Sequence, residues 1–155
     1  MVRERSPERV EFLASILWEV VLNNGGYGGL YTVEENIDDS VPKTEWYAVM
    51  AEMEDQSEKH RVTIDTIARG VSVITGSKLQ PYVCTKAKCP DGHRYCDNGK
   101  PLLHNSKGER LWLNPNYKRD IVAASMANAD ESCAMDVTHY LAIAECGIYG
   151  RVVFG

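Results

Sequence analysis

The sequence has no long hydrophobic run: no stretch of its 155 residues approaches the roughly 20 consecutive apolar residues that a helix needs to cross a bilayer. The opening segment, MVRERSPERVEF, also lacks the uninterrupted apolar core of a secretory signal peptide. No recognised motif supplies a nucleophile, a base and an oxyanion donor together. These absences predict a cytoplasmic protein and favour a binding protein over an enzyme.

The five cysteines are an odd number, and in a reducing compartment they are expected to be thiols or metal ligands rather than disulfides. The strongest local pattern is Cys84-x4-Cys89-x3-His93-x2-Cys96. Three thiolates and one imidazole suit tetrahedral Zn²⁺, so the pattern predicts one structural zinc. The spacing matches no standard zinc finger, which leaves two alternatives: cysteines without a metal, or a disulfide between Cys84 and Cys96.

The composition is that of a folded domain. Hydrophobic residues make up 44% of the chain and charged residues 25%, a balance typical of globular proteins. The length is sufficient to bury most of the apolar surface. We therefore predict that residues 1–155 form a single globular domain.

The spacing of apolar residues predicts the secondary structure. In the central stretch, residues 60–75, Ile67 and Val71 share one helical face, and Thr63 is placed to cap the helix. Alternation over residues 45–54 is typical of an interior strand. Helices are expected near residues 7–23, 63–75, 117–127 and 135–146, with further strands or turns at 30–33, 109–113 and 152–154. The predicted fold is α+β, with about four helices packed on a small, mainly antiparallel sheet.

Residues 77–108 show no sustained periodicity and are rich in Gly, Pro, Asn, Lys and Cys. A structureless loop of this length is unusual within a compact domain. We expect an irregular, cysteine-containing insert here that is either clamped, for example by zinc, or mobile.

The net charge of −5 conceals a segregation of charge along the chain. Residues 34–58 carry nine acidic side chains and only Lys43 as a base, whereas residues 78–119 carry nine basic side chains and three acidic ones. This split suits an acidic partner on one side and a basic partner on the other. Alternatively, the two stretches face each other within the fold or across a homodimer.

The central helix suggests a ligand site. Arg61 and Arg69 could line a groove with Trp46 or Tyr47 and bind a small anionic ligand. Asp65 lies one helical turn from each arginine. The simpler interpretation is a solvated ion pair between Asp65 and Arg69.

A nucleic-acid interface is the alternative for the basic stretch. Lysine and arginine alternate there with aromatic side chains, the composition of a loop that contacts phosphates and stacks on bases. The candidate residues are Lys86, Lys88, Arg94, Tyr95 and Lys100. The acid-rich remainder of the chain argues against general affinity for nucleic acids.

A third possibility is a hydrolase. Asp136 and His139 are spaced i, i+3 on the last predicted helix, so the carboxylate can contact and orient the imidazole. Asp136 is also placed to cap that helix. This spacing is common by chance, so it does not by itself indicate catalysis.

Four segments together resemble a family of small proteins without a known activity, encoded in actinobacteria and in the phages that infect them. The segments are FLASILWEVVLNNGG, RVTIDTIARGVSVI, LLHNSKGERLWLNP and DVTHYLAIAECGIYGRVVFG. The resemblance implies a phage or mobile-element protein in the bacterial cytoplasm. Together with the lack of a catalytic motif, it favours a non-enzymatic binding protein that engages a host protein or sequesters a small anionic ligand, with a zinc-stabilised nucleic-acid-binding accessory protein as the alternative.

Overall fold

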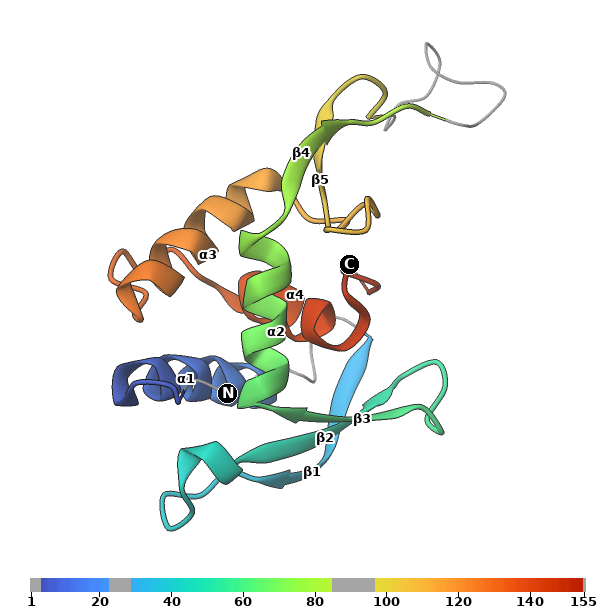
Figure 1. Ribbon diagram of the computed structural model, residues 1–155. Coiled ribbons are helices and arrows are strands. Elements are labelled where there is room, and N and C mark those ends of the chain that lie inside the picture. Colours follow the sequence, from blue (N-terminus) through green and yellow to red (C-terminus); the bar gives the residue numbers. More distant parts are fainter. Residues whose placement is uncertain (1–3, 23–28, 85–96, 155) are drawn as a thin grey trace.

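The computed structural model describes residues 4–22, 29–84 and 97–154. Within these residues it contains four α-helices and two antiparallel sheets, one of three strands and one of two, which confirms the α+β fold class. The elements follow one another as α1 (Pro7–Leu22), β1 (Leu30–Asn36), the 3₁₀ turn η1 (Lys43–Glu45), β2 (Tyr47–Glu52), β3 (Lys59–Thr63), α2 (Ile64–Thr75), β4 (Lys78–Pro81), β5 (Pro101–His104), α3 (Pro115–Ala127) and α4 (Val137–Tyr149) (Figure 1).

Helix α2 lies at the centre of the molecule, between α1, α4 and the sheets (Figure 1). Its apolar face is buried as the spacing predicts, with Ile67 and Val71 almost wholly excluded from water. Thr63 caps the helix: its side chain accepts from the Asp65 amide, and the Thr66 hydroxyl accepts from the Thr63 amide. The predicted cap and helix are therefore confirmed.

The larger sheet has the strand order β1-β2-β3 and presents Ala48, Met50 and Val62 to the core. Strand β3 was not predicted, because most of its residues fall in the central stretch, residues 60–75, whose spacing predicts a helix. The strand contains only one fully buried side chain, Val62, so its apolar alternation is too weak to predict it. Its hydrogen bonds to β2 define it instead.

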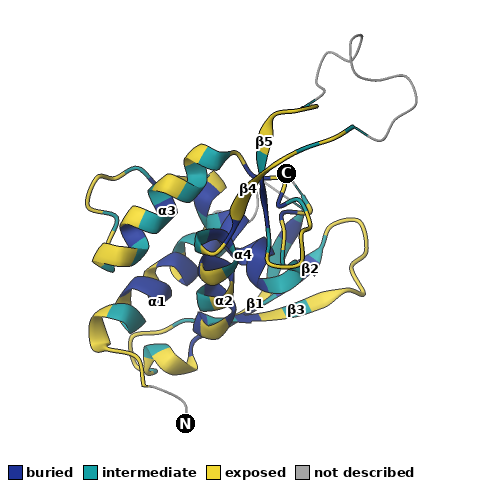
Figure 2. Ribbon diagram, turned by 45° about the horizontal axis from the view of Figure 1, so that its top comes forward, coloured by how far each residue is buried: buried dark blue, intermediate teal, exposed yellow. Residues whose placement is uncertain are grey.

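The prediction of an irregular segment over residues 77–108 is wrong at both ends. Strands β4 and β5 pair there as an antiparallel hairpin, with Leu79 opposite Leu103. All four residues of β4 are exposed, so no burial pattern marks the strand in the sequence. The hairpin projects from the helices (Figure 1), and exposed residues run along it (Figure 2).

The chain end differs from the expected strand at residues 152–154. The Val152 amide donates to the Leu111 carbonyl, whereas the Val153 and Phe154 amides donate to the buried Glu145 side chain. A carboxylate thus takes the place of a neighbouring strand. The expected strand or turn at 109–113 is reduced to a single bridge between His104 and Arg110.

Helix α4 runs to Tyr149, three residues beyond its expected end, and then stops at Gly150, whose φ is +80°. Gly147 does not end the helix, because it lies in the crossing of α4 over α2, where its missing side chain leaves room for the Thr66 carbonyl. The buried apolar residues of all four helices and the larger sheet form one cluster. Among the described residues, no helix has both the length and the apolar character needed to span a membrane.

Candidate functional site

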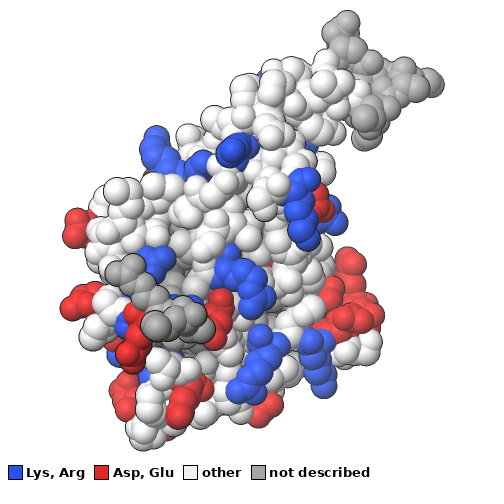
Figure 3. Space-filling view, viewed as in Figure 1, with Lys and Arg blue, Asp and Glu red and all other residues white. Residues whose placement is uncertain are grey.

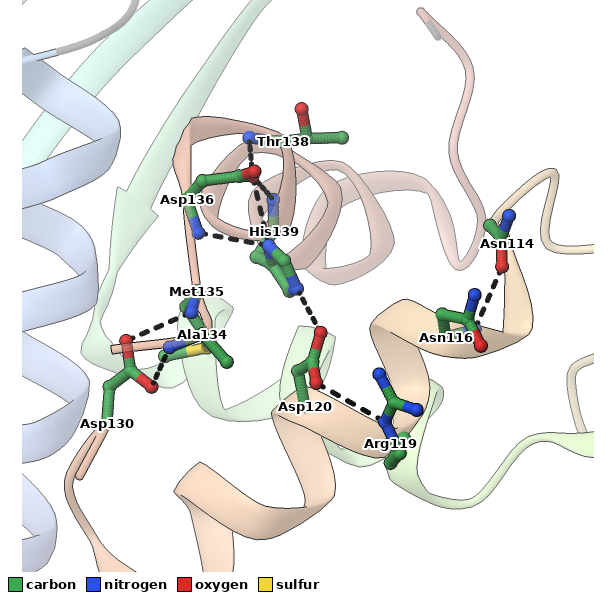
Figure 4. Close-up of polar contacts among 10 residues, drawn as sticks. All are labelled: Asn114, Asn116, Arg119, Asp120, Asp130, Ala134, Met135, Asp136, Thr138 and His139. Carbon is green, nitrogen blue, oxygen red and sulfur yellow. Dashed lines mark hydrogen bonds and ion pairs between the residues drawn. The ribbon is translucent and has the colours of Figure 1, made fainter. Parts of the chain in front are cut away.

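The predicted contact between Asp136 and His139 is present at the start of α4 (Figure 4). His139 is only 3% exposed. The Asp136 amide donates to its Nδ1, with 3.0 Å between the two nitrogens, while the Asp136 carboxylate accepts from the Thr138 and His139 amides. His139 and Asp136 therefore close a reciprocal cap on the helix, as the sequence predicts for Asp136.

A third residue, Asp120 of α3, was not expected in this group. Its Oδ2 lies 3.0 Å from Nε2 of His139, and the Tyr117 ring packs edge-on against the imidazole. With the proton on Nε2, the ring donates to Asp120 and accepts from the Asp136 amide. Asp120 is 19 residues from His139 in sequence, and only the packing of α3 against α4 brings the two together.

This network joins α3 to the start of α4. The hydrogen bond from His139 lowers the pKa of Asp120, and hydrogen bonds from His139, including its amide, and from the Thr138 amide lower the pKa of Asp136, so both carboxylates are ionised at neutral pH. Both ring nitrogens of the buried imidazole are already bonded, so neither is available to take a proton from a substrate. The hydrolase hypothesis gains no support from this arrangement.

The predicted anionic-ligand residues are only partly brought together. The Arg61 guanidinium lies 3.8 Å from the centre of the Tyr47 ring, as the hypothesis requires. Trp46 is buried instead, and its Nε1 donates to the Asp38 and Val41 carbonyls. Ligand binding at Tyr47 and Arg61 stays a prediction, without Trp46 in the same groove.

The predicted ion pair between Asp65 and Arg69 is wrong. Asp65 pairs with Arg5, with 2.6 Å between carboxylate and guanidinium. Arg69 donates to the Gly147 carbonyl, 3.0 Å away. The α2–α4 crossing supplies a partner for Arg69 that helical spacing could not reveal.

Most of the predicted zinc and nucleic-acid residues lie outside the described residues: Cys89, His93 and Cys96 for the metal, and Lys86, Lys88, Arg94 and Tyr95 for nucleic acid. Cys84 and Lys100 are described. The Cys84 amide donates to the Asn98 side chain, and Lys100 lies in the turn before β5. Zinc binding by the cysteine pattern and nucleic-acid binding by the basic stretch therefore both stay predictions.

Among the described residues, Glu52, Glu58 and His60 form a group that could hold a metal ion. One ligand atom from each lies within 4.8 Å of the others. This group was not predicted, because recognising it requires the pairing of β2 with β3, and β3 itself was not expected.

The surface carries a stack of Tyr82, Arg110 and Trp112. The Arg110 guanidinium lies 3.8 Å from the centre of the Trp112 ring and 4.9 Å from that of Tyr82. A salt bridge of 2.7 Å to Asp97 holds the guanidinium in place. The stack therefore presents aromatic rings in a fixed arrangement at the base of the hairpin.

Trp112 is 56% exposed and has a left-handed backbone, with φ of +59°. A non-glycine residue in this region costs on the order of 1 kcal/mol, and such strain is concentrated at functional sites. Two hollows adjoin its ring. One of about 410 Å³ is lined by Arg151, Val152 and Val153, and one of about 280 Å³ extends between Leu113, Tyr117, Leu141 and Phe154. We call Tyr82, Arg110, Trp112, Arg151 and Val153 the Trp112 face.

Comparisons with protein-family models, with curated proteins and with solved structures found no match.

Proposed function

We propose that this protein is a non-enzymatic binding protein that engages a host protein through the Trp112 face. The observation that carries the proposal is Trp112 itself, a large aromatic side chain held in water on a strained backbone. Burying it against a partner would release apolar surface from water, worth about 25 cal/mol per Å² before the losses of association. Tryptophan, tyrosine and arginine are also the residues that contribute most to binding at protein interfaces.

The chemistry of the face defines the partner. Val153, 45% exposed, lies beside Trp112 at one hollow, and the half-exposed Arg151 guanidinium there forms a loose, 4.0 Å ion pair with the half-exposed Glu109. Around the base of the hairpin the molecule displays basic side chains and few acidic ones (Figure 3). We infer a partner segment that combines an apolar anchor with acidic side chains.

The proposed origin and cellular setting of the protein rest on sequence features. The resemblance supports a phage or mobile-element origin and a bacterial cytoplasmic setting, and the segregation of charge supports an oriented encounter with an acidic partner. A zinc ion held by Cys84, Cys89, His93 and Cys96 would stabilise the segment that continues from the hairpin. Nucleic-acid binding through Lys100 and the lysines before it remains the competing proposal.

The test compares capture from host lysate by the wild type, Trp112→Ala and the control Trp18→Ala. Trp18 is also an exposed tryptophan, 41% exposed, but lies on α1. We expect a host protein that the wild type and the control retain equally and that Trp112→Ala loses by tenfold or more. The purified partner should then bind the wild type directly, more weakly as salt rises, and more weakly still to Arg151→Glu.

Two outcomes contradict the proposal. In one, no captured protein is lost with Trp112→Ala and retained with Trp18→Ala. In the other, the chain binds generic DNA or RNA with a steep salt dependence that Trp112→Ala leaves unchanged, which favours the nucleic-acid alternative instead.

A further inference from the structure

The group of Glu52, Glu58 and His60 is assembled by the hairpin of β2 and β3. Met50 pairs with His60, and the Glu52 amide donates to the Glu58 carbonyl at the closing end of the hairpin. Side chains of directly paired residues point to the same face of a sheet, and so do those two positions further along. The three side chains therefore project together, on the face that also carries the buried Met50.

Among the described residues, no lysine or arginine forms an ion pair with Glu52 or Glu58. In the part of the chain that the structure describes, Glu52 forms its ion pair with His60, at 3.1 Å, and Glu58 forms none. Lys59 lies between Glu58 and His60, but alternation along the strand directs its side chain to the opposite face. The Glu58 carboxylate thus lies close to the Glu52–His60 pair, within 4.8 Å, without an ion pair of its own among the described residues.

The last residue of α4, Tyr149, packs against this group. The Tyr149 hydroxyl lies 3.1 Å from Nε2 of His60, and the two rings meet edge to face. Tyr149 in turn packs edge-on against Phe154. The Glu52 and His60 side chains are about four-fifths buried, at 19% and 22% exposure. Such partial burial strengthens the attraction of the carboxylates for a cation relative to a fully solvated surface.

We propose that Glu52, Glu58 and His60 bind one first-row divalent cation of the zinc type. Two carboxylate oxygens and an imidazole nitrogen are donors that Zn²⁺ accepts in proteins, with bonds of about 2.0–2.2 Å. Ligand atoms in a tetrahedral shell then lie roughly 3.5 Å apart, and the observed spread, within 4.8 Å, closes to this by small side-chain rotations. Water completes the shell.

The imidazole sets the selectivity. Mg²⁺ and Ca²⁺ prefer oxygen ligands only, whereas nitrogen donors suit zinc and its neighbours. On binding, Nε2 of His60 exchanges its contacts with Glu52 and Tyr149 for the metal. The bound ion joins the end of β2 to the start of β3, beside the last turn of α4, so its role is that of a structural clasp.

The experiment must separate this site from the cysteine pattern. We would substitute Cys84, Cys89 and Cys96 by serine together and titrate the full-length variant with Zn²⁺ by calorimetry in a non-chelating buffer. We expect one equivalent to remain bound and the melting temperature to rise by roughly 5–10 °C at a hundredfold excess over the dissociation constant. Mg²⁺ should produce neither effect.

Two further variants are made in the protein that lacks Cys84, Cys89 and Cys96: Glu58→Gln, which removes a proposed ligand, and Glu54→Gln, which is the control. Both residues are exposed acids of the same turn, so neither change is expected to unfold the protein. Glu58→Gln should weaken Zn²⁺ binding by tenfold or more, as should His60→Gln, and Glu54→Gln should leave it unchanged. Loss of all zinc binding in the variant that lacks Cys84, Cys89 and Cys96, or equal affinity of the two glutamate variants, overturns the proposal. The zinc measurement does not depend on whether the Trp112 face binds a partner.

Discussion

Gly70 of α2 and Gly147 of α4 occupy the crossing of these helices, each against the backbone of the other. A Cβ on Gly70 would come within 1.8 Å of the Ile143 carbonyl oxygen, and one on Gly147 within 2.1 Å of the Thr66 carbonyl oxygen. These contacts leave no room for any side chain. The closeness also brings the Gly147 carbonyl within reach of Arg69.

Gly70→Ala is therefore expected to destabilise the protein by about 2–3 kcal/mol or more, because backbone atoms must move to admit one methyl group. Urea unfolding followed by circular dichroism measures the loss. Gly99→Ala is the control: its φ is +78°, but nothing lies within 4 Å of the added Cβ. Its cost should be limited to backbone strain of about 1 kcal/mol. Equal losses for the two variants would show that the crossing is not tight.

His139→Ala should lower the free energy of unfolding by about 2–4 kcal/mol. The substitution leaves a cavity, removes the acceptor of the Asp136 amide and removes the hydrogen bond from His139 to Asp120, whose carboxylate keeps its 3.5 Å ion pair with Arg119. His104→Ala is a matched control, because His104 is also buried but, among the described residues, its ring has one hydrogen bond, with the Leu102 carbonyl. We expect a smaller loss there. A larger loss at His104 would contradict the network's role.

Acid should weaken the same network. His139 lowers the pKa values of Asp120 and Asp136 below 3.8 in the folded protein, so their contribution to stability is complete above that pH. It is lost as pH falls through the folded pKa values. Asp120→Asn removes one of the two contributions, so its stability should fall less steeply than that of the wild type in this acidic range. Urea unfolding at several pH values measures the slopes, and parallel slopes would argue against the assignment.

Glu145 should show the opposite pH dependence. Burial raises its pKa above 4.5, partly offset by the amides of Phe154 and Val153. The folded protein therefore holds this proton more tightly than the unfolded chain, and wild-type stability attributable to Glu145 declines as pH rises through the folded pKa. Glu145→Gln retains an oxygen for both amides and does not titrate. Its stability relative to wild type should thus improve from about pH 4.5 to neutral pH, as urea unfolding at each pH would show. A constant difference contradicts this.

Cys146 should resist alkylation in the folded protein. Burial, with the nearby Glu145 charge, raises the pKa of its thiol to about 12, so almost no thiolate is present at mildly alkaline pH. Cys133 is exposed and provides the internal comparison. Peptide mapping after brief iodoacetamide treatment should find Cys133 modified and Cys146 intact, and both modified in urea. Equal labelling of the two in the folded state would mean that α4 opens readily.

The helices could be predicted from the sequence, because the interactions that form them join residues close together in the chain. Apolar spacing and capping side chains such as Thr63 and Asp136 act within one or two helical turns, so the four helices and the α+β class could be read from the chain. The same holds for the contact between Asp136 and His139, which are three residues apart. Within the described residues, these local features agree with the structure.

Tertiary structure decided everything that depends on partners distant in sequence. Strands β3, β4 and β5 exist because of hydrogen bonds to a neighbour, and too few of their side chains are buried to leave a periodic signal. Asp120 reaches His139, Arg5 takes Asp65, and Glu145 holds the chain end only once the helices have packed. Local preference determines which segments form helices, whereas burial and long-range hydrogen bonding determine which side chains meet.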